Sequence, residues 1–319
     1  MNRPKLSLIL PIYNVSQYIE RCLQSIFQND FDDSDIELIL VDDASPDNSV
    51  EIALSWLNKN GHTNFKLITQ ENKGLGGARN TGIDNASAPW IWFIDSDDEI
   101  TPRAIPIILK NLNQSLDFIS FNALSLPSKT LAHPTLKKPI EHVHAEDLAS
   151  KYLLNSPCFN IYNIAFLKNK GLRFKEKFLH EDNEFSIRVN YFADKLSLFP
   201  ESIYIYNTQN ASSITNAVNP KKVDDLMAHF DTYDRLITLH PSPKQLRAMQ
   251  LENTVPFYWL WNLRLKATGN SRQKLDKIFS ENRWRFVDAF SQLSLKQRFS
   301  IYLHTTIWYP KLKKLLNRI

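Results

Sequence analysis

Four carboxylates gather in the last six positions of the stretch WIWFIDSDDEI, which runs from Trp90 to Ile100. They are Asp95, Asp97, Asp98 and Glu99, and they follow five apolar residues typical of a buried strand. Helix capping explains one or two acids at such a place, but three aspartates in four positions favour a site for a hard cation. An Asp-x-Asp pair offers oxygen ligands to Mg²⁺ or Mn²⁺, which commonly complete their shell with substrate phosphates. An EF-hand calcium loop is excluded, because Ile100 occupies its glycine position and Pro106 its glutamate position.

A second pair of carboxylates, Asp42 and Asp43 in the stretch VDDAS, ends another apolar segment. Alone, an Asp-Asp-x-Ser sequence carries little weight, because it often caps the helix that follows. Two strand ends loaded with carboxylates favour one shared site if both lie at the same edge of one sheet.

Glycine is concentrated in NKGLGGARNTG, Asn72 to Gly82, which contains four of the seven glycines of the chain. We expect a turn here, in which glycine lets a ligand approach the backbone, and the flanking Lys73 and Arg79 favour an anionic ligand. A purely structural turn is the alternative. The stretch is not a Rossmann fingerprint, which should follow the first strand directly, and it lacks the Gly-Lys-Ser/Thr ending of a P-loop.

Glu181 and Asp182, in the stretch HEDNEF, open a predicted amphipathic helix. Acidic residues are common in a first helical turn, because they interact favourably with the helix dipole. A transferase whose metal handles a leaving phosphate also needs a base for its nucleophile, and a carboxylate fixed at a helix start can be that base. Both interpretations stay open on these residues alone.

The first hundred residues alternate between strand and helix patterns, which predicts a parallel α/β sheet that binds ligands at the carboxyl ends of its strands. The predicted strands cover 6–14, 36–45, 65–69 and 90–95, and the helices between them cover 16–26, 49–58 and 78–85. Ser16 is the expected N-cap of the first helix. From about residue 220 the chain is predicted to be helical, with one helix over 221–239 and another over 243–267.

Length and composition describe a globular protein: 319 residues, 43% of them hydrophobic, suit one large domain or a main domain with an appendage. No segment approaches the roughly eighteen continuous apolar residues of a membrane span, so we expect a cytoplasmic protein. The two cysteines, Cys22 and Cys158, form neither a disulfide framework nor a metal-ligand spacing.

Charge is distributed unevenly along the chain: residues 1–240 carry a net charge of −7 and residues 241–319 a net charge of +11. The end of the chain, 293–319, mixes basic residues with Tyr302, Trp308 and Tyr309, as interfacial segments do. We therefore expect peripheral attachment to an anionic membrane surface, the inner face of the cell membrane, which would hold a lipid-linked acceptor. The alternative is that these aromatic residues pack on the main domain. A nucleic-acid partner is not expected, because no nucleic-acid motif is present.

Together these stretches resemble the family 2 glycosyltransferases, enzymes of the GT-A fold that act on nucleotide sugars. The matching pieces are LSLILPIYNVSQYIERCLQSIF, ELILVDDASPDNSVEI, NKGLGGARNTGIDNASAPWIWFIDSDD and FLHEDNEFSIRV, in the order of the family. The resemblance implies a GT-A catalytic domain over 1–215, with a Rossmann-like, mostly parallel sheet flanked by helices. A basic, aromatic-rich helical region over 216–319 would extend it.

The resemblance also implies roles for individual residues. Nucleotide binding is implied for Pro11, Tyr13, Asp43, Asn72, Gly74, Arg79, Asp95 and Ser96. Asp43 would accept a hydrogen bond from uracil, which makes uridine the expected base. Asp97 would be the direct metal ligand beside Asp95, with Asp98 as a second candidate. Asp182 would be the catalytic base, supported by Glu181.

The activity implied by the resemblance is inverting, dependent on Mn²⁺ or Mg²⁺, and directed to surface polysaccharide: capsule, lipopolysaccharide or exopolysaccharide. A hexosyl or N-acetylhexosaminyl group would move from a nucleotide sugar, expected to be a UDP-sugar, to a hydroxyl of a glycan or lipid-linked acceptor. The string ENRWRF, Glu281 to Phe286, does not match the Gln-x-x-Arg-Trp motif of processive relatives, which favours addition of single sugars.

Two other functions stay open. A sugar nucleotidyltransferase should carry a glycine-rich motif with arginine directly after the first strand, where this chain has PIYNVSQ. A non-catalytic nucleotide-binding protein is expected to lose a metal aspartate or the base, and both sets are intact here.

Overall fold

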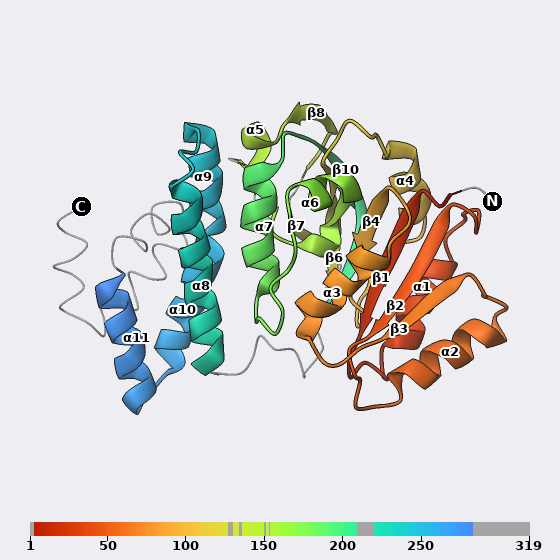
Figure 1. The fold of residues 1–319 in the computed structure, drawn as a ribbon, viewed down its shortest axis with the longest axis horizontal. Coiled ribbons are helices and arrows are strands. Elements are labelled where there is room, and N and C mark those ends of the chain that lie inside the picture. Colours follow the sequence, from red (N-terminus) through yellow and green to blue (C-terminus); the bar gives the residue numbers. More distant parts are fainter. Residues whose placement is uncertain are drawn as a thin grey trace.

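The computed structural model describes residues 3–126, 130–133, 136–149, 151–152, 154–208 and 220–282 (Figure 1). In that part of the chain ten strands form one sheet in the order β3-β2-β1-β4-β9-β6-β10-β5, with β7 beside β6 and β8 beside β10. The strands are β1 (Leu6–Ile12), β2 (Ile36–Asp42), β3 (Phe65–Thr69), β4 (Trp90–Phe93), β5 (Glu99–Ile100), β6 (Phe118–Leu126), β7 (Thr130–His133), β8 (Ile140–His144), β9 (Asn160–Asn163) and β10 (Lys195–Asn207). The helices are α1 (Ile19–Phe27), α2 (Ser49–Lys59), α3 (Gly74–Asn85), α4 (Ala104–Asn111), α5 (Ala145–Ala149), α6 (Ile164–Asn169), α7 (Glu181–Phe192), α8 (Pro220–Ile237), α9 (Pro243–Glu252), α10 (Thr254–Lys266) and α11 (Gly269–Glu281), besides the 3₁₀ turn η1 (Pro157–Phe159).

The first four strands pair in parallel with one another, as predicted. β1 pairs in parallel with β2 and β4, and β2 pairs in parallel with β3. All residues of β1 and β4 are buried, which explains why these strands are continuous apolar runs in the sequence. The predicted N-cap is wrong, because α1 begins at Ile19 and the Ser16 N–H donates to Asp47.

Beyond β4 the sheet becomes mixed. β9 runs antiparallel between β4 and β6, and β10 pairs in parallel with β6. The sequence did not predict β9, because it has only four residues and both its ends are asparagines. These asparagines are buried and bonded: Asn163 accepts from the Ala165 N–H at the start of α6, and the Asn160 side chain donates to the Tyr162 hydroxyl.

The helices α8 and α9 pack on α7, on its side away from the sheet, and α10 and α11 follow beyond them (Figure 1). They have a hydrophobic cluster of their own, which includes Phe230, Phe257 and Trp261. A separate cluster, with Ile187 of α7 and Tyr233 of α8, joins them to the rest of the molecule. The C-terminal part of the described chain is therefore helical, as predicted.

The single helix predicted over 243–267 is wrong, because the structure has two helices that meet at Asn253. Pro256 lies in the first turn of α10 and has no N–H to donate to the Glu252 carbonyl, so the helical hydrogen bonding is interrupted there. The Asn253 side chain hydrogen-bonds His229 of α8 at 2.9 Å, which holds the junction in place.

In the described ranges no helix combines the length and the apolar character that crossing a bilayer requires. The basic, aromatic stretch 293–319 and the predicted domain boundary at residue 215 both lie outside the described residues.

Candidate active site

The carboxyl ends of β1, β2 and β4 are bonded to one another, and the acidic stretches follow them directly. The Asp43 N–H donates to the Ile12 carbonyl at 3.0 Å, and the Ser96 hydroxyl donates to the Pro11 carbonyl. Pro11 and Ser96 are both buried, and the bond from the Ser96 side chain to the Pro11 backbone holds the segment after β4 against β1. The two acid-rich strand ends thus lie at one edge of one sheet, as the alternating pattern predicted.

Arg79 of α3 connects the two acidic motifs that lie far apart in the sequence. Its Nη2 is 2.7 Å from Asp95 Oδ1, and its Nη1 is 2.7 Å from Glu181 Oε1. The side chain is only 2% exposed, and its guanidinium lies over the Phe174 ring at 5.2 Å from the ring centre. Burial alone would lower the pKa of Arg79, but the carboxylates, Asp95 first, outweigh it and hold that pKa above its ordinary value. The guanidinium therefore acts as the structural link between the Asp-x-Asp turn and the start of α7.

The aspartates of the Asp-x-Asp turn have different surroundings. Asp98 is buried and accepts two hydrogen bonds from β10, from the Tyr204 hydroxyl at 2.7 Å and the Asn207 N–H at 2.7 Å. Burial, together with Asp97 and Asp95, raises the pKa of Asp98 well above its usual range. Asp97 and Asp95 are only half-buried. Asp98 holds the turn to β10, and its two neighbours are the more accessible carboxylates.

The carboxylate oxygens of this turn suit a hard cation whose other ligands are phosphate oxygens of a bound molecule. In the part of the chain that the structure describes, no three His, Cys, Asp or Glu side chains form a closed metal cage. An Mg²⁺ or Mn²⁺ ion held by one or two carboxylates and completed by phosphate oxygens and water needs no such cage. The oxygens of Asp97 and Asp95 fit an ion of this kind.

Tyr13 and Asp43 lie at the ends of the neighbouring strands β1 and β2. The Tyr13 side chain is 49% exposed, which is unusual for so large a ring beside a buried strand. Asp43 is buried, and its Oδ1 accepts from Gln70 Nε2 and the Lys73 N–H, both at 2.7 Å. Both hydrogen bonds that described residues make to this carboxylate fall on Oδ1. The Asn72 side chain donates to the Asp43 carbonyl at 3.1 Å and steadies the same place.

α3 begins at Gly74, so the predicted turn is wrong over 74–77, and the helix predicted over 78–85 is confirmed as the rest of α3. Gly74 itself has a φ of +75°, a conformation that favours glycine. At Gly76 an added Cβ would lie 2.4 Å from the Lys175 carbonyl oxygen, and at Gly82 it would lie 2.2 Å from the Ile9 side chain. The glycines let α3 pack closely on β1 and on the segment that precedes α7.

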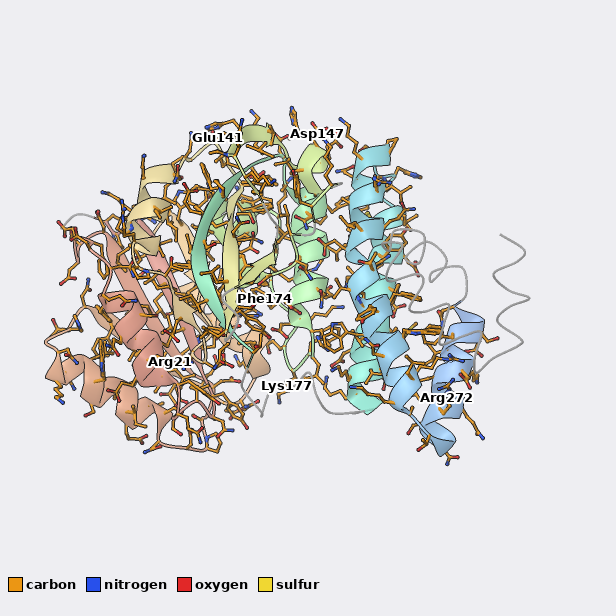
Figure 2. All side chains as sticks on the ribbon, turned by 180° about the vertical axis from the view of Figure 1, so that it is seen from behind. Arg21, Glu141, Asp147, Phe174, Lys177 and Arg272 are labelled. Atoms are coloured by element: carbon orange, nitrogen blue, oxygen red, sulfur yellow. The ribbon has the colours of Figure 1, made fainter. Side chains whose placement is uncertain are left out.

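That segment is fixed to α3 by reciprocal bonds. Asn80 Nδ2 donates to the Phe174 carbonyl and the Phe174 N–H donates to Asn80 Oδ1, both at 2.9 Å. The Lys177 N–H donates to the Lys73 carbonyl at 2.7 Å. Figure 2 shows Phe174 between the strands and α7, with Lys177 near the end of α7 where Glu181 begins the helix. α3 therefore fixes the path of the chain into the Glu-Asp pair.

Glu181 and Asp182 form the first turn of α7, as predicted. The preceding residue, His180, has a φ of 61° and makes no side-chain cap. Asp182 Oδ1 accepts from the Asn183 N–H at 2.9 Å. Burial raises the pKa of both Glu181 and Asp182, against the lowering effects of Arg79 on the first and the Asn183 N–H on the second.

Sequence reasoning missed Tyr204 and Asn207, which belong to the candidate site, and Trp259, which packs at its border. The first two hold Asp98, and Trp259 of α10 stacks on His180 with 5.6 Å between ring centres. Tyr204 and Asn207 lie near the end of a long strand, LSLFPESIYIYN, and polar groups at a strand end in this kind of sheet are the signal that could have found them. Trp259 carries no such signal, because its helix is apolar on several sides.

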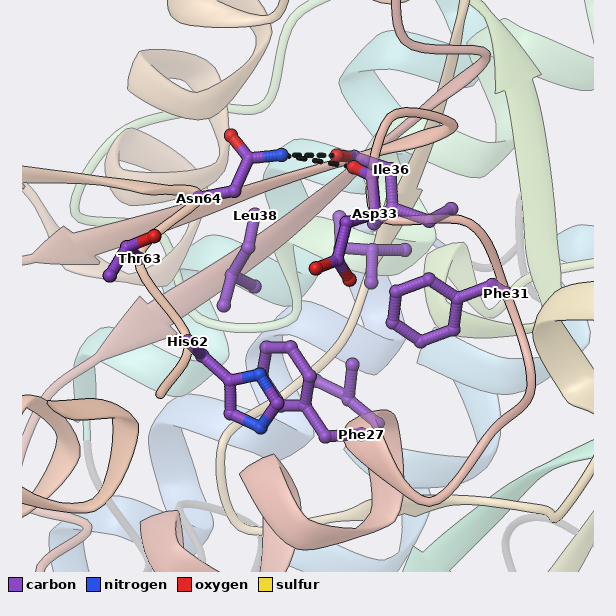
Figure 3. Close-up of a pocket in the computed structure, with 10 residues that line it drawn as sticks. Phe27, Phe31, Asp33, Ile36, Leu38, His62, Thr63 and Asn64 are labelled. Carbon is purple, nitrogen blue, oxygen red and sulfur yellow. Dashed lines mark hydrogen bonds between the residues drawn. The ribbon is translucent and has the colours of Figure 1, made fainter. Parts of the chain in front are cut away.

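A separate small pocket lies at the opposite edge of the sheet, at the amino ends of β2 and β3 (Figure 3). Phe27, Phe31, Leu38 and His62 line it, and its volume of about 20 Å³ holds about one water. Asn64 Nδ2 closes its rim by donating to the Asp33 carbonyl at 3.0 Å and the Ile36 carbonyl at 3.3 Å. The carboxylates of the candidate site are not among its lining residues.

Known proteins resemble this chain in sequence. Residues 7–169 match the family model described as glycosyl transferase family 2. The chain is 31% identical to the putative glycosyltransferase EpsH of Bacillus subtilis over 73% of this chain and 69% of the relative. It is 28% identical to a GalNAc(5)-diNAcBac-PP-undecaprenol beta-1,3-glucosyltransferase of Campylobacter jejuni, over 66% of this chain and 67% of the relative. It is 30% identical to the uncharacterized glycosyltransferase EpsJ of B. subtilis, of whose length the match covers 66%.

Solved structures show the same fold at lower sequence identity. The crystal structure of Staphylococcus aureus TarS 1–349 in complex with UDP-GlcNAc superposes with a TM-score of 0.68 at 20% identity, over 90% of this chain and 79% of that chain. A mannosyltransferase of Pyrobaculum calidifontis in complex with GDP-Man and Mn²⁺ superposes with a TM-score of 0.56 at 14% identity, over 97% of this chain and 88% of that chain. The expected α/β fold of the GT-A type is thereby confirmed. With the family model matched over half of its length, this chain belongs to glycosyltransferase family 2 and is a glycosyltransferase.

Proposed function

We propose that this glycosyltransferase is metal-dependent, inverting and non-processive, and that it transfers a sugar from a UDP-sugar to a hydroxyl of a glycan or lipid-linked acceptor in bacterial surface polysaccharide synthesis. The observation that carries the proposal is the Arg79 link, with 2.7 Å contacts to Asp95 and Glu181. This link joins the Asp-x-Asp turn, whose carboxylates would bind the cation, to the start of α7, where Asp182 would be the base.

The names of relatives support the substrate class. TarS of S. aureus is a poly(ribitol-phosphate) beta-N-acetylglucosaminyltransferase, and its crystal structure contains UDP-GlcNAc. The C. jejuni relative acts on an undecaprenol-linked glycan and forms a beta linkage. A beta product from an α-linked UDP-sugar requires inversion, and the Mn²⁺ in the P. calidifontis structure supports use of a divalent ion by this fold.

The reaction needs a base, a nucleophile and a stabilised leaving group. Asp182 accepts the proton of the acceptor hydroxyl, whose oxygen attacks the anomeric carbon from the face opposite the diphosphate. The bond from that carbon to the diphosphate oxygen breaks, and UDP leaves. A bound Mn²⁺ or Mg²⁺ would supply neutralisation of the charge that grows on the diphosphate. Asp97 and Asp95 would hold that ion, and Tyr13 and Asp43 would hold the uracil base.

Asp97 and Asp98 are expected to respond differently to substitution, and UDP with Mn²⁺ tests the difference. For the wild type, UDP at about 100 times its Kd should raise the free energy of unfolding by about 2.7 kcal/mol, seen as a higher melting temperature. Asp97→Asn should remove the part of this gain that requires Mn²⁺. Asp98→Asn should keep the Mn²⁺ dependence and lower the free energy of unfolding of the ligand-free protein by about 1–3 kcal/mol, because it disturbs buried hydrogen bonds to Tyr204 and Asn207.

The control is UDP with EDTA, which should give Asp97→Asn and the wild type the same stabilisation. A wild type stabilised equally by UDP with Mn²⁺ and with EDTA would contradict metal dependence. An Asp98→Asn variant that alone loses the Mn²⁺ effect would assign the ion to Asp98.

We also propose that residues 283–319 attach the enzyme to the cytoplasmic face of an anionic membrane. In the described helices many basic side chains already pair with acids, as Arg264 and Arg272 do with Asp276 and Lys274 does with Asp224. Residues 283–319 have eight basic residues and one acidic residue. Anionic lipids attract such residues with about 1 kcal/mol each near the surface.

A chain that ends after residue 282 is therefore expected to lose most of its binding to vesicles that contain phosphatidylglycerol. Sedimentation with vesicles compares it with the full chain, and vesicles of phosphatidylcholine alone are the control, to which neither protein should bind strongly. High salt should release the full chain, because it screens the attraction. Equal binding of the truncated and full chains to anionic vesicles would refute the attachment.

A further inference from the structure

Tyr206 is an exposed aromatic residue near the end of β10, and its neighbours Tyr204 and Asn207 are buried. Its side chain is 40% exposed, whereas Tyr204 and Asn207 are buried. Both of those neighbours are bonded to Asp98, Tyr204 through its hydroxyl and Asn207 through its N–H, each at 2.7 Å. The backbone on either side of Tyr206 is therefore fixed against the Asp-x-Asp turn, and the ring is presented from a rigid strand.

The strand period places the Tyr206 ring just beyond that turn. Residues two apart on a strand share a face and lie about 6.6–6.8 Å apart along it. Tyr204 meets the turn directly, because its hydroxyl also accepts from the Asp95 N–H at 3.1 Å. Tyr206 stands on the same face, one step farther toward the open edge of the sheet where α7 begins.

The charges around Tyr206 agree with this position. Burial and the carboxylates of Asp98, Asp95, Asp97 and Asp182, in that order, raise the pKa of Tyr206 to about 12. Its hydroxyl is thus protonated at neutral pH, and in the described part of the chain no residue hydrogen-bonds it. Three of these four acids belong to the Asp-x-Asp turn, which agrees with the place of Tyr206 one step along the strand from Tyr204.

An exposed aromatic face with a protonated hydroxyl is suited to a pyranose ring, whose C–H groups pack on the face while a sugar hydroxyl bonds the phenol. We propose that Tyr206 contacts the transferred sugar of the nucleotide-sugar donor, between the diphosphate and the base Asp182. This inference rests on the proposed function. It assigns to β10 a part of the donor pocket that the motifs of the sequence do not mark.

The test compares the binding of a nucleotide with that of its sugar conjugates. Affinities for UDP, UDP-glucose and UDP-N-acetylglucosamine, each with Mn²⁺, are measured by calorimetry for the wild type, Tyr206→Ala and Tyr206→Phe. Tyr206→Ala should leave the Kd of UDP within about threefold of wild type and raise the Kd of the better-bound UDP-sugar about tenfold or more, as expected for loss of an aromatic contact. Tyr206→Phe should recover most of that loss, because it keeps the ring.

Tyr258→Ala is the matched control, since Tyr258 of α10 is 41% exposed, and it should bind all three ligands like the wild type. If Tyr206→Ala does not fold, Tyr206→Leu keeps apolar bulk and takes its place. Wild-type affinity of the folded variant for both UDP-sugars would overturn the assignment, even if transfer to an acceptor were slower. A wild type that binds neither UDP nor the two UDP-sugars would instead refute the proposed function. Failure of the Tyr206 assignment and failure of the proposed function thus give different results.

Discussion

Replacement of Asp182 by asparagine is expected to lower the rate of sugar transfer by about 10²–10⁴-fold, the usual contribution of a positioned general base. Asparagine has nearly the same shape and can still accept the hydrogen bond that the Asn183 N–H donates to Asp182 at 2.9 Å. It cannot take the proton of the acceptor hydroxyl. Transfer is measured with saturating UDP-sugar and Mn²⁺, and the affinity for UDP should stay within about threefold of wild type because the base does not touch the nucleotide.

Glu181→Gln is the matched control for this loss. Glu181 lies in the same helical turn, but its carboxylate is bonded to Arg79 at 2.7 Å, so its role is to hold the site together. We expect a smaller loss of rate than for Asp182→Asn. An Asp182→Asn variant with a third or more of wild-type activity, or a Glu181→Gln variant that is the more impaired of the two, would contradict the assignment of the base.

The pH dependence of the reaction gives a second readout. Burial raises the pKa of Asp182, and a base must be deprotonated to act, so activity should fall as the pH is lowered through this raised pKa. The acidic limb of the profile of kcat/KM against pH should therefore lie above the range of an ordinary aspartate. That limb should be absent from the residual activity of Asp182→Asn.

The parallel half of the fold could be predicted because its residues follow strong local rules. β1, β2 and β4 are buried on both faces and therefore appear in the sequence as apolar runs. β9 could not be predicted, since four residues with asparagine at both ends show no strand pattern. Its place between β4 and β6 depends on contacts with residues far away in the sequence.

The residue types in the sequence indicated where the site lies. They did not show which carboxylate of the site is accessible and which is buried. Whether Asp97 or Asp98 is accessible depends on the Tyr204 hydroxyl, which lies 106 positions from Asp98 in the chain. The glycine-rich stretch was recognised as special for close approach, yet the partners are the Lys175 carbonyl and the Ile9 side chain. Such contacts arise from tertiary packing, which local propensity does not describe.

Replacement of Arg79 by methionine is expected to have the largest effect on stability, about 3–5 kcal/mol, because it breaks a buried ionic network by removing one partner. Arg79 is 2% exposed and serves two carboxylates at once, at 2.7 Å each. Methionine fills similar space but leaves Asp95 and Glu181 near each other without a cation. Arg79→Lys should recover only part of the loss, because a single ammonium cannot span both carboxylates as a planar guanidinium does. Denaturant unfolding measures the change, and transfer activity should fall in the same order.

Arg173→Met is the matched control, because Arg173 also makes two 2.7 Å contacts to one carboxylate, that of Asp84 in α3. Its side chain is 45% exposed, so its loss should cost less than about 1 kcal/mol.

The difference in stability between the two variants should also depend on pH. Without the guanidinium the pKa of Glu181 rises further, so the deficit of Arg79→Met should shrink as the pH falls and the buried carboxylates become neutral. If Arg79→Met loses no more free energy of unfolding than Arg173→Met, Arg79 does not hold the two acidic motifs together. A loss for Arg79→Met that grows as the pH falls would mean the same.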